Sequence, residues 1–338
     1  MNVHENFNLK HLNTFGINVS ANYFVECCSV DELKAILSDE QFINQPQLIL
    51  GGGSNILFTK NFDGLIIKNN LKGIELVKED ADFYHVKCAA GEVWHEFVIH
   101  CIANNYAGLE NLSLIPGNVG ASPMQNIGAY GVEIKDTFFE LEAIHIKEKN
   151  IQKFTNEQCK FGYRESVFKR ELKNQFIITS VTFKLRKKPV FNTSYGAIET
   201  ELQSMGATNL TIQAISQAVC NIRNSKLPNP KEIGNAGSFF KNPEVSNITW
   251  DQLKNTFPGS IGYHLESGNV KLAAGWLIEQ CGWKGKQIGD AGVHKLQALV
   301  LVNYNDAKGQ EVFELSQKII DSVKEKFGVL LEREVNII

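Results

Sequence analysis

The sequence lacks the paired cysteines of a zinc site or a disulfide framework. It has seven cysteines in 338 residues, an odd number, and no two of them form a Cys-x-x-Cys pair. This pattern argues against both a secreted disulfide scaffold and a thiolate metal site. We therefore expect reduced thiols and a cytoplasmic protein.

Long apolar runs and an excess of positive charge are missing as well. No apolar run approaches the roughly 18 residues of a membrane span, and residues 1–11 lack the basic start and apolar core of a signal peptide. The formal net charge is −3, whereas nucleic-acid binding calls for a basic patch or stripe. We expect neither a membrane nor a nucleic acid as a partner, so local lysines and arginines must bind any anionic ligand.

The eight histidines form no metal-binding or catalytic pattern. His95 and His100 lie on one predicted helix, but five residues apart instead of the four that would place them on the same face. We therefore expect no metal site.

The composition, with 43% apolar and 21% charged residues, is that of an ordinary globular protein, and the length predicts two or three domains. Residues 1–70 read as a small α/β unit. There the capping-box spacing at Ser29 predicts a helix through Leu37, and an apolar strand over 47–50 runs into a glycine turn.

The later regions differ in their periodicity. In residues 71–210 an amphipathic helix near 93–102 accompanies strands at 84–88, 138–147 and 176–186. The last of these strands alternates like a half-buried antiparallel strand. From residue 211 on, the pattern predicts helices at 212–222, 272–281 and 312–327, a strand at 298–303, and a short terminal strand over 329–338.

Two glycine-rich segments suggest one large shared cofactor. Residues 51–55 (Gly-Gly-Gly-Ser-Asn) follow a strand and offer backbone N–H groups that can cradle a pyrophosphate, although a plain glycine turn is equally compatible. Residues 112–131 are rich in glycine, small side chains and amides. Such a lining suits a flat, neutral, hydrogen-bonding ligand, with a long structural loop as the alternative.

Residues 234–243 (Gly-Asn-Ala-Gly-Ser-Phe-Phe-Lys-Asn-Pro) are the most informative stretch. Glycines let the backbone approach a ligand, and Ser238 in such a frame can be aimed at a reacting carbon, while Lys241 and Asn242 supply donors for an anionic substrate. The plain alternative is a glycine-rich turn followed by an edge strand.

Several charged residues are further candidates for anion binding. Arg164, between aromatics and Glu165, can pair bidentately with a carboxylate or phosphate, or simply with a neighbouring acid. Glu334 shares one face of the terminal strand with Glu332 by the two-residue period. Three lysines flank glycine or proline positions: Lys226, Lys271 and Lys284.

Taken in chain order, these segments resemble the UDP-N-acetylenolpyruvoylglucosamine reductase family, flavoenzymes of peptidoglycan precursor synthesis. The resemblance runs nearly end to end. It is carried by residues 13–17 (Asn-Thr-Phe-Gly-Ile), 51–55, 112–131, 161–166 (Phe-Gly-Tyr-Arg-Glu-Ser), 226–230 (Lys-Leu-Pro-Asn-Pro), 234–243, 271–281 and 332–335 (Glu-Arg-Glu-Val). Together, in order and at matching intervals, they make the match very specific.

The resemblance implies an α+β protein with a two-part FAD-binding unit of the vanillyl-alcohol-oxidase type and a C-terminal α+β substrate-binding domain. The expected boundaries are 1–70 and 71–210 for the FAD-binding subdomains and 211–328 for the substrate domain, with the strand 329–338 returning to the FAD-binding unit. Tyr195 and its surroundings resemble the longer subclass, in which a tyrosine loop covers the substrate.

The resemblance also implies the reaction: NADPH reduces FAD, and UDP-N-acetylglucosamine enolpyruvate then receives a hydride and a proton to become UDP-N-acetylmuramate. Arg164 and Glu334 are expected to hold and polarise the substrate carboxylate, and Ser238 is expected to give its proton as general acid, helped by Lys241 or water. FAD and NADPH are the implied cofactors, and we expect a monomer. One departure stands out, because Asn336 occupies a position where relatives commonly carry arginine.

The expected FAD-binding residues are Gly51, Gly52, Gly53, Ser54, Asn55, Pro116, Gly117, Gly120, Ala121, Ser122, Gln125, Asn126, Gly128, Ala129 and Gly131. The expected substrate-binding residues are Tyr130, Tyr195, Lys226, Asn242, Tyr263, Lys284 and Gln297.

Three rival functions remain open from the sequence. Another FAD-dependent oxidoreductase of the same superfamily, acting on a hydroxy acid or alcohol, would keep both glycine-rich segments but would not need Ser238, Lys226 and Lys284 together. A flavin-binding module without catalysis would bind the cofactor and not turn over NADPH. A sugar-nucleotide binding protein would contain no flavin.

Overall fold

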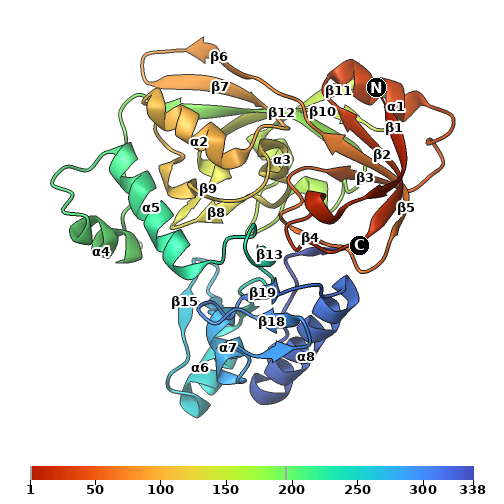
Figure 1. Cartoon of the computed structure of the whole chain (residues 1–338). Coiled ribbons are helices and arrows are strands. Elements are labelled where there is room, and N and C mark those ends of the chain that lie inside the picture. Colours follow the sequence, from red (N-terminus) through yellow and green to blue (C-terminus); the bar gives the residue numbers. More distant parts are fainter. Residues whose placement is uncertain (1, 195) are drawn as a thin grey trace. The chain divides into compact units, whose positions relative to one another are not determined.

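The computed structural model describes residues 2–194 and 196–338 and divides the chain into two compact units (Figure 1). The first unit holds the residues up to Phe7, Ala21–Gly52 and Asp63–Ser225. The second unit holds Asn8–Ser20, Gly53–Phe62 and Lys226–Ile338. Within the described residues, no helix is long and apolar enough to cross a membrane.

A four-stranded sheet lies mainly in the first unit, in the order β1 (Val3–Asn8), β2 (Ser20–Cys27), β5 (Phe62–Asn69) and β3 (Gln47–Leu50). β3 runs parallel to β5. The predicted helix is α1 (Val30–Ser38), and its capping box is present, because the Ser29 hydroxyl accepts from the Glu32 N–H and the Glu32 carboxylate accepts from the Ser29 N–H. The predicted helix and its capping box are thus confirmed.

The larger sheet of the first unit is antiparallel, in the order β11 (Ile151–Thr155), β10 (Phe138–His145), β12 (Phe176–Arg186), β7 (Phe83–Ala89) and β6 (Ile74–Glu79). The helix α2 (Trp94–Ala103) packs into the same core. A short helix, α3 (Asn156–Cys159), follows β11. The predicted helix and strands are confirmed, with strand ends shifted by one or two residues.

The half-buried description of β12 holds only at its end, where Lys184 and Arg186 are exposed and Leu185 between them is buried. It is wrong over residues 177–182, which are all buried. Ile177 and Ile178 are neighbours that point into two different core clusters, so both faces of the strand are covered there. Thr182 is buried as well. The polar residues that mimic a solvent face are satisfied inside the protein: the Thr179 hydroxyl, for example, donates to the Glu142 carbonyl at 3.0 Å.

The 112–131 segment is ordered by short turns. Three 3₁₀ turns, Glu110–Leu112, Val119–Ala121 and Pro123–Gln125, precede a small hairpin of β8 (Gly128–Ala129) and β9 (Val132–Glu133). Two helices follow later in the same unit, α4 (Gly196–Ser204) and α5 (Ile212–Lys226, of which Lys226 is assigned to the second unit), and their apolar faces form one cluster. The helix predicted over 212–222 is confirmed.

The second unit contains an antiparallel sheet in the order β13 (Gly234–Ser238), β19 (Val300–Asn303), β18 (Ala291–Val293) and β17 (Gln287–Ile288). A smaller sheet joins β14 (Glu244–Val245), β16 (Val270–Leu272) and β15 (Gly262–His264). Its helices are α6 (Asn247–Thr256), α7 (Ala274–Gln280) and α8 (Gly309–Phe327).

Three boundary predictions in the second unit have different outcomes. α8 ends at Gly328, whose φ of +68° gives the predicted glycine cap. The helix expected from Leu272 begins at Ala274, because Leu272 closes β16. The terminal strand shrinks to β20 (Asn336–Ile337), which pairs in parallel with β4 (Ile56–Leu57).

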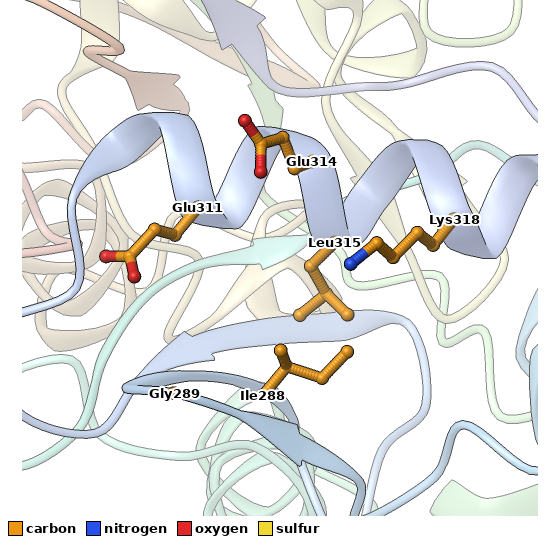
Figure 2. Close-up of a pocket in the computed structure, with 6 residues that line it drawn as sticks. All are labelled: Ile288, Gly289, Glu311, Glu314, Leu315 and Lys318. Carbon is orange, nitrogen blue, oxygen red and sulfur yellow. The ribbon is translucent and has the colours of Figure 1, made fainter.

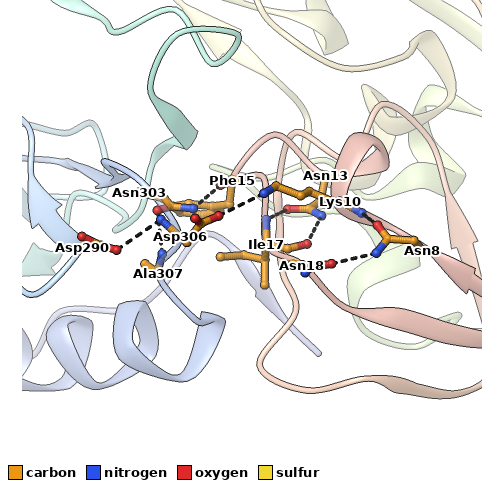
Figure 3. Close-up of polar contacts among 10 residues, drawn as sticks. All are labelled: Asn8, Lys10, Asn13, Phe15, Ile17, Asn18, Asp290, Asn303, Asp306 and Ala307. Atoms are coloured by element: carbon orange, nitrogen blue, oxygen red, sulfur yellow. Dashed lines mark hydrogen bonds and ion pairs between the residues drawn. The ribbon is translucent and has the colours of Figure 1, made fainter.

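The segment 9–17 braces the second unit through a buried asparagine (Figure 3). The Asn13 side chain donates to the Leu9 and Ile17 carbonyls and accepts from the Ile17 N–H. Asn303 of β19 donates to the Phe15 carbonyl at 2.9 Å and accepts from the Ala307 N–H. Both asparagines are buried, so side-chain amides replace missing backbone partners here.

Glycine is required where this segment meets the rest of the second unit. A Cβ on Gly53 would lie 1.9 Å from the Leu12 carbonyl oxygen, and a Cβ on Gly234 would lie 2.2 Å from the Phe15 carbonyl oxygen. These are backbone atoms that cannot move aside. The close approach explains the third glycine of the 51–55 turn without any ligand.

We expect Gly53→Ala to destabilise the protein far more than Gly16→Ala. Both glycines have left-handed φ, +64° and +67°, but a Cβ on Gly16 meets nothing within 4 Å. Gly16→Ala should therefore cost about 1–2 kcal/mol from backbone strain alone, and Gly53→Ala about 3 kcal/mol or more from the added clash. Denaturant unfolding measures both, and equal losses would contradict the packing explanation.

Candidate functional site

The two glycine-rich segments meet in the first unit, as a shared cofactor would require. A Cβ on Gly52 would lie 2.9 Å from the Gly117 Cα and 2.8 Å from the Asn118 Oδ1. A residue with a side chain at position 52 would therefore separate the two turns. The Asn118 side chain donates to the Gly91 carbonyl at 2.7 Å, which fixes it beside the turn.

The groups around this contact suit an anionic ligand. Within residues 2–194 and 196–338, the backbone N–H groups of Gly52, Gly117 and Asn118 donate to no protein acceptor. The ammonium group of Lys68 donates to the Gly51 carbonyl, and burial lowers the pKa of Lys68. Free N–H groups and a nearby cation at a cradle that admits no Cβ fit the pyrophosphate of FAD.

Other predicted FAD residues serve the loop itself. The Ser122 hydroxyl is buried and donates to the Val119 carbonyl at 2.8 Å. A Cβ on Gly120 would lie 2.5 Å from the Ala90 Cβ. Pro116 and Ala121 are exposed, whereas Gly128 and Ala129 are partly exposed in the hairpin. Gly131 is exposed with φ of +80°. The exposed backbone of this segment is therefore accessible to a ligand.

Asn126 is fully buried and its side chain makes three hydrogen bonds within the protein. Its amide nitrogen donates to the Glu133 carboxylate at 2.9 Å and to the Gly162 carbonyl at 3.0 Å, and its oxygen accepts from the Lys135 N–H. Both donors of the side chain are therefore engaged with the protein. Asn126 instead ties the 112–131 segment to the turn that carries Arg164.

Arg164 is held on that turn by its backbone and its guanidinium. It has φ of +54°, and Gly162 and Glu165 exchange backbone hydrogen bonds around it. Its Nη2 donates to the Gly128 carbonyl at 2.7 Å, and the guanidinium lies 5.4 Å from the centre of the Tyr163 ring. The partners of Glu165 include Arg170, at 2.9 Å.

Sequence reasoning missed Arg223 on α5. Its Nε donates to the Leu114 carbonyl at 3.1 Å. Burial lowers the pKa of Arg223. Tyr130 opposes that effect through its charge and through a hydrogen bond that its side-chain oxygen accepts from the guanidinium. The signal was present in the sequence, because Arg223 follows Ile215 and Val219 at four-residue steps on the apolar face of α5.

In the second unit, a β-bulge presents Ser238. The register of β13 against β19 shifts between Asn235 and Ser238, and Gly237 there has φ of +69°. The Asn235 side chain accepts from the Gly237 N–H at 3.0 Å. Bulges re-aim side chains at strand edges. Ser238 is exposed, and among the described residues its hydroxyl has no hydrogen-bond partner.

The chain's last residues run beside Ser238. The Glu334 N–H donates to the Phe239 carbonyl at 2.8 Å, and the Lys241 N–H donates to the Glu332 carbonyl at 2.9 Å. The structure thus brings two predicted catalytic residues of this unit, Ser238 and Glu334, onto adjacent extended segments. The plain alternative for residues 234–243 is correct only in part, because the glycine-rich residues Gly234–Ser238 themselves form the edge strand β13 and not a turn before it.

Asn336 has a defined structural role at the position where the resemblance predicts arginine. Its side chain donates to the Asn55 carbonyl at 2.9 Å, and its backbone N–H donates to the same oxygen at 3.1 Å. The Asn55 side chain in turn donates to the Glu334 carbonyl at 3.3 Å. Gly53, Ser54 and Asn55 all belong to this second unit, where Asn55 helps to fix the backbone of Glu334.

The predicted donors after Ser238 are engaged with the protein. Lys241 pairs with Glu332 at 2.6 Å, and that carboxylate side chain is 71% exposed, so the pair contributes little to stability. The Asn242 side chain accepts from the Ala274 N–H at 3.0 Å at the start of α7. Asn242 therefore caps a helix, which leaves its amide N–H groups for a ligand.

The remaining predicted substrate residues lie at several places on the second unit. Tyr263 is half exposed on β15, opposite Lys271. Lys284 pairs with Glu279 at 2.9 Å, and the Gln297 oxygen accepts from the Leu299 N–H. Lys226 is exposed at the end of α5. Tyr195 lies outside the described residues.

A shallow pocket on the second unit contains none of the predicted site residues. It is formed by β17 and α8, and Figure 2 shows Leu315 pointing toward Ile288 there. Its other lining residues are Gly289, Glu311, Glu314 and Lys318. Across residues 2–194 and 196–338, no group of three or more His, Cys, Asp or Glu could hold a metal ion.

Comparison with protein families assigns both ends of the chain. Residues 21–149 match the family of the FAD binding domain, and residues 229–338 match the family described as UDP-N-acetylenolpyruvoylglucosamine reductase, C-terminal domain. The chain is 54% identical to the UDP-N-acetylenolpyruvoylglucosamine reductase of Flavobacterium johnsoniae and 51% identical to that of Amoebophilus asiaticus, with 100% of each chain covered in both cases.

A relative from Pseudomonas putida with the same name is 47% identical, covering 98% of both chains. Among solved structures, UDP-N-acetylenolpyruvylglucosamine reductase from Thermus caldophilus superimposes with a TM-score of 0.70 at 24% identity, covering 100% of this chain and 99% of that one. At this identity the superposition supports the fold.

We expect Asn126→Ala to lower the free energy of unfolding by about 3 kcal/mol, because three hydrogen bonds of about 1 kcal/mol each are lost. Asn174→Ala is the matched control. Asn174 shares the left-handed backbone, with φ of +60° against +43°, but it is exposed. Denaturant unfolding should show a small loss for the control. Equal losses would mean that backbone strain, and not the hydrogen bonds, sets the cost.

Proposed function

The chain belongs to the UDP-N-acetylenolpyruvoylglucosamine reductase family and is an FAD-binding oxidoreductase, and we propose that it reduces UDP-N-acetylglucosamine enolpyruvate to UDP-N-acetylmuramate with NADPH. The geometric observation that supports this most directly is the hydrogen bond from the Glu334 N–H to the Phe239 carbonyl. This bond places the backbone of Glu334, whose side chain carries the carboxylate, next to the segment that carries the exposed Ser238.

We propose that the contact between Gly52 and Gly117 in the first unit holds the FAD pyrophosphate. Bound FAD would supply the hydride acceptor for NADPH and the hydride donor for the enol-ether carbon. The chain contributes the unpaired N–H groups of Gly52, Gly117 and Asn118, with the positive charge of Lys68 nearby. These groups bind by geometry and charge and take no part in bond making.

Proton delivery is the role we propose for Ser238. The bulge at Gly237 presents its hydroxyl to solvent without an internal acceptor, so its proton is free for a substrate atom. An alcohol is a weak acid and needs a stabilised oxyanion. Lys241 can supply that charge when it exchanges its exposed partner Glu332 for the serine oxygen.

For Glu334 and Arg164 we propose binding and polarisation of the substrate carboxylate. The Asn55 side chain holds the Glu334 carbonyl, and Asn336 in turn holds the Asn55 carbonyl. The Gly128 carbonyl orients the Arg164 guanidinium. Donors fixed before the reaction lower the barrier for charge that develops on that carboxylate. Lys226 and Lys284 are proposed partners of the substrate phosphates, with Tyr130, Tyr263, Asn242 and Gln297 as further contacts.

The remaining assignments rest on the family resemblance. We propose FAD-binding subdomains at 1–70 and 71–210 and a substrate domain at 211–328. We further propose that the strand 329–338 returns to the FAD-binding unit. The family matches over 21–149 and 229–338 support the distinction between an FAD-binding part and a C-terminal domain. We also propose a monomer in the cytoplasm and membership of the longer subclass, in which Tyr195 belongs to a loop over the substrate.

One anaerobic titration tests the proposed reaction. Adding NADPH to the purified protein should bleach the yellow oxidised flavin band, and adding UDP-N-acetylglucosamine enolpyruvate should restore it. Bleaching without recovery would contradict the proposed acceptor and favour a flavoenzyme for a hydroxy acid or alcohol. A colourless protein that cannot be reconstituted with FAD would contradict the flavin assignment.

We expect Ser238→Ala to separate the two half-reactions. Loss of a positioned general acid costs about 10²–10⁴ in rate, so reoxidation by the substrate should slow by that factor while reduction by NADPH stays within about twofold. Rapid-mixing absorbance measures both steps. Ser267→Ala, another exposed serine of the second unit, is the control, and reoxidation at the wild-type rate in Ser238→Ala would refute the acid role.

A further inference from the structure

Leu114 has a backbone conformation that its side chain disfavours. Its φ is +58°, in the left-handed region that glycine and asparagine tolerate and leucine does not. It lies two residues before Pro116 and three before Gly117, at the entrance to the turn that meets Gly52. Surrounding contacts must therefore hold this conformation in place.

Two side chains, each from a different helix of the first unit, make hydrogen bonds with the Leu114 backbone. Its N–H donates to the Nδ1 of His95 on α2 at 2.9 Å, and its carbonyl accepts from the Nε of Arg223 on α5 at 3.1 Å. Neighbouring residues are anchored in the same way. Trp94 Nε1 donates to the Leu112 carbonyl at 2.8 Å, and the Ser113 hydroxyl shares a hydrogen bond with a hydroxyl of α5.

The bond to Leu114 defines the protonation state of His95. A backbone N–H can only donate, so Nδ1 must accept and must carry no proton. The neutral ring then keeps its single proton on Nε2. Protonation at Nδ1 would set two donors against each other and break the contact with Leu114.

The surroundings of His95 favour this neutral form. Burial is the main cause that lowers its pKa, and the Arg223 charge lowers it further, while Glu96 on the same helix opposes both. Its folded pKa thus lies below the ordinary value of about 6.5. The stability that the contact contributes is complete above that pH and is lost as the pH falls toward the lowered value.

We propose that His95 is a positioning residue for the 112–131 segment, which holds Leu114 in its left-handed conformation only while the imidazole is neutral. The α2 N-terminus continues the same anchor, because the Trp94 N–H donates to the Gly117 carbonyl at 2.9 Å. Loss of the His95 contact therefore loosens the turn that places Gly117 beside Gly52. This inference rests on the proposed role of that turn in binding FAD.

The test compares FAD affinity at pH 8.0 and pH 5.5 in wild type, His95→Asn and His100→Asn, measured by the recovery of free-flavin fluorescence. Asparagine can accept through Oδ1 where histidine accepts through Nδ1, but it does not titrate. His100 is exposed on the same helix. The loss of one hydrogen bond predicts a weakening for wild type and His100→Asn at pH 5.5 that reaches about five- to tenfold when His95 is fully protonated. His95→Asn should stay within about threefold of wild type at pH 8.0 and change little with pH.

A second pair of variants separates positioning from general loss of structure. His95→Leu should weaken FAD binding about five- to tenfold at pH 8.0. In a Leu114→Gly background, where the left-handed conformation costs little, that loss should shrink to about twofold. Glu110→Gln is the control for titration nearby, since burial raises the pKa of Glu110 in the preceding turn. It should keep the wild-type pH profile.

Three results would overturn this inference while leaving the proposed function intact. The first is a wild-type pH profile in His95→Asn, and the second is an undiminished effect of His95→Leu in the Leu114→Gly background. The third is a pH profile that becomes flat in Glu110→Gln, which would assign the pH dependence to that carboxylate. Absence of FAD binding by the wild-type protein at pH 8.0 would instead refute the proposed function, and the inference with it.

Discussion

Contacts between backbone segments that leave no room for a Cβ determine the structure of both units. Gly53 lies against the Leu12 carbonyl, Gly234 against the Phe15 carbonyl, and Gly52 against Gly117. Each contact joins residues that are 41 to 219 positions apart in the chain. The candidate residues depend on them, because Ser238 ends the strand that Gly234 opens, and the cradle proposed for FAD is the contact between Gly52 and Gly117.

Local sequence patterns predicted helices and their ends well where a few neighbouring residues determine them. The capping box of α1 and the glycine that ends α8 are set by a few neighbouring residues, and the apolar period of α5 is read in the same way. Residues 177–182 of β12 were misjudged because Thr179 and Ser180 donate hydrogen bonds to Glu142, which lies on another strand. Alternation in one strand cannot report such a partner.

The candidate site follows the same division. The types of residue in the two glycine-rich segments predicted one large shared cofactor, the family resemblance implied that it is FAD, and the family comparison confirms FAD. The sequence did not reveal which residues bind and which support. Asn126 and Ser122 are consumed by internal hydrogen bonds, whereas Lys68 and Arg223 act through carbonyl oxygens. Carbonyl partners exist at every residue. The pattern that places Arg223 on the apolar face of α5 therefore marks it as buried but does not reveal which carbonyl it binds.

The way the second unit is made from separate stretches constrains the order of folding. Residues 8–20 and 53–62 belong with residues 226–338, and β4 pairs with β20 at the very end of the chain. During synthesis these two early stretches must wait, without their partners, until residues 226–338 have left the ribosome. Closing such long loops is slow. A fragment that starts near residue 226 would lack the stretches that cover Gly234 and fix Glu334, so this unit should fold only as part of the whole chain.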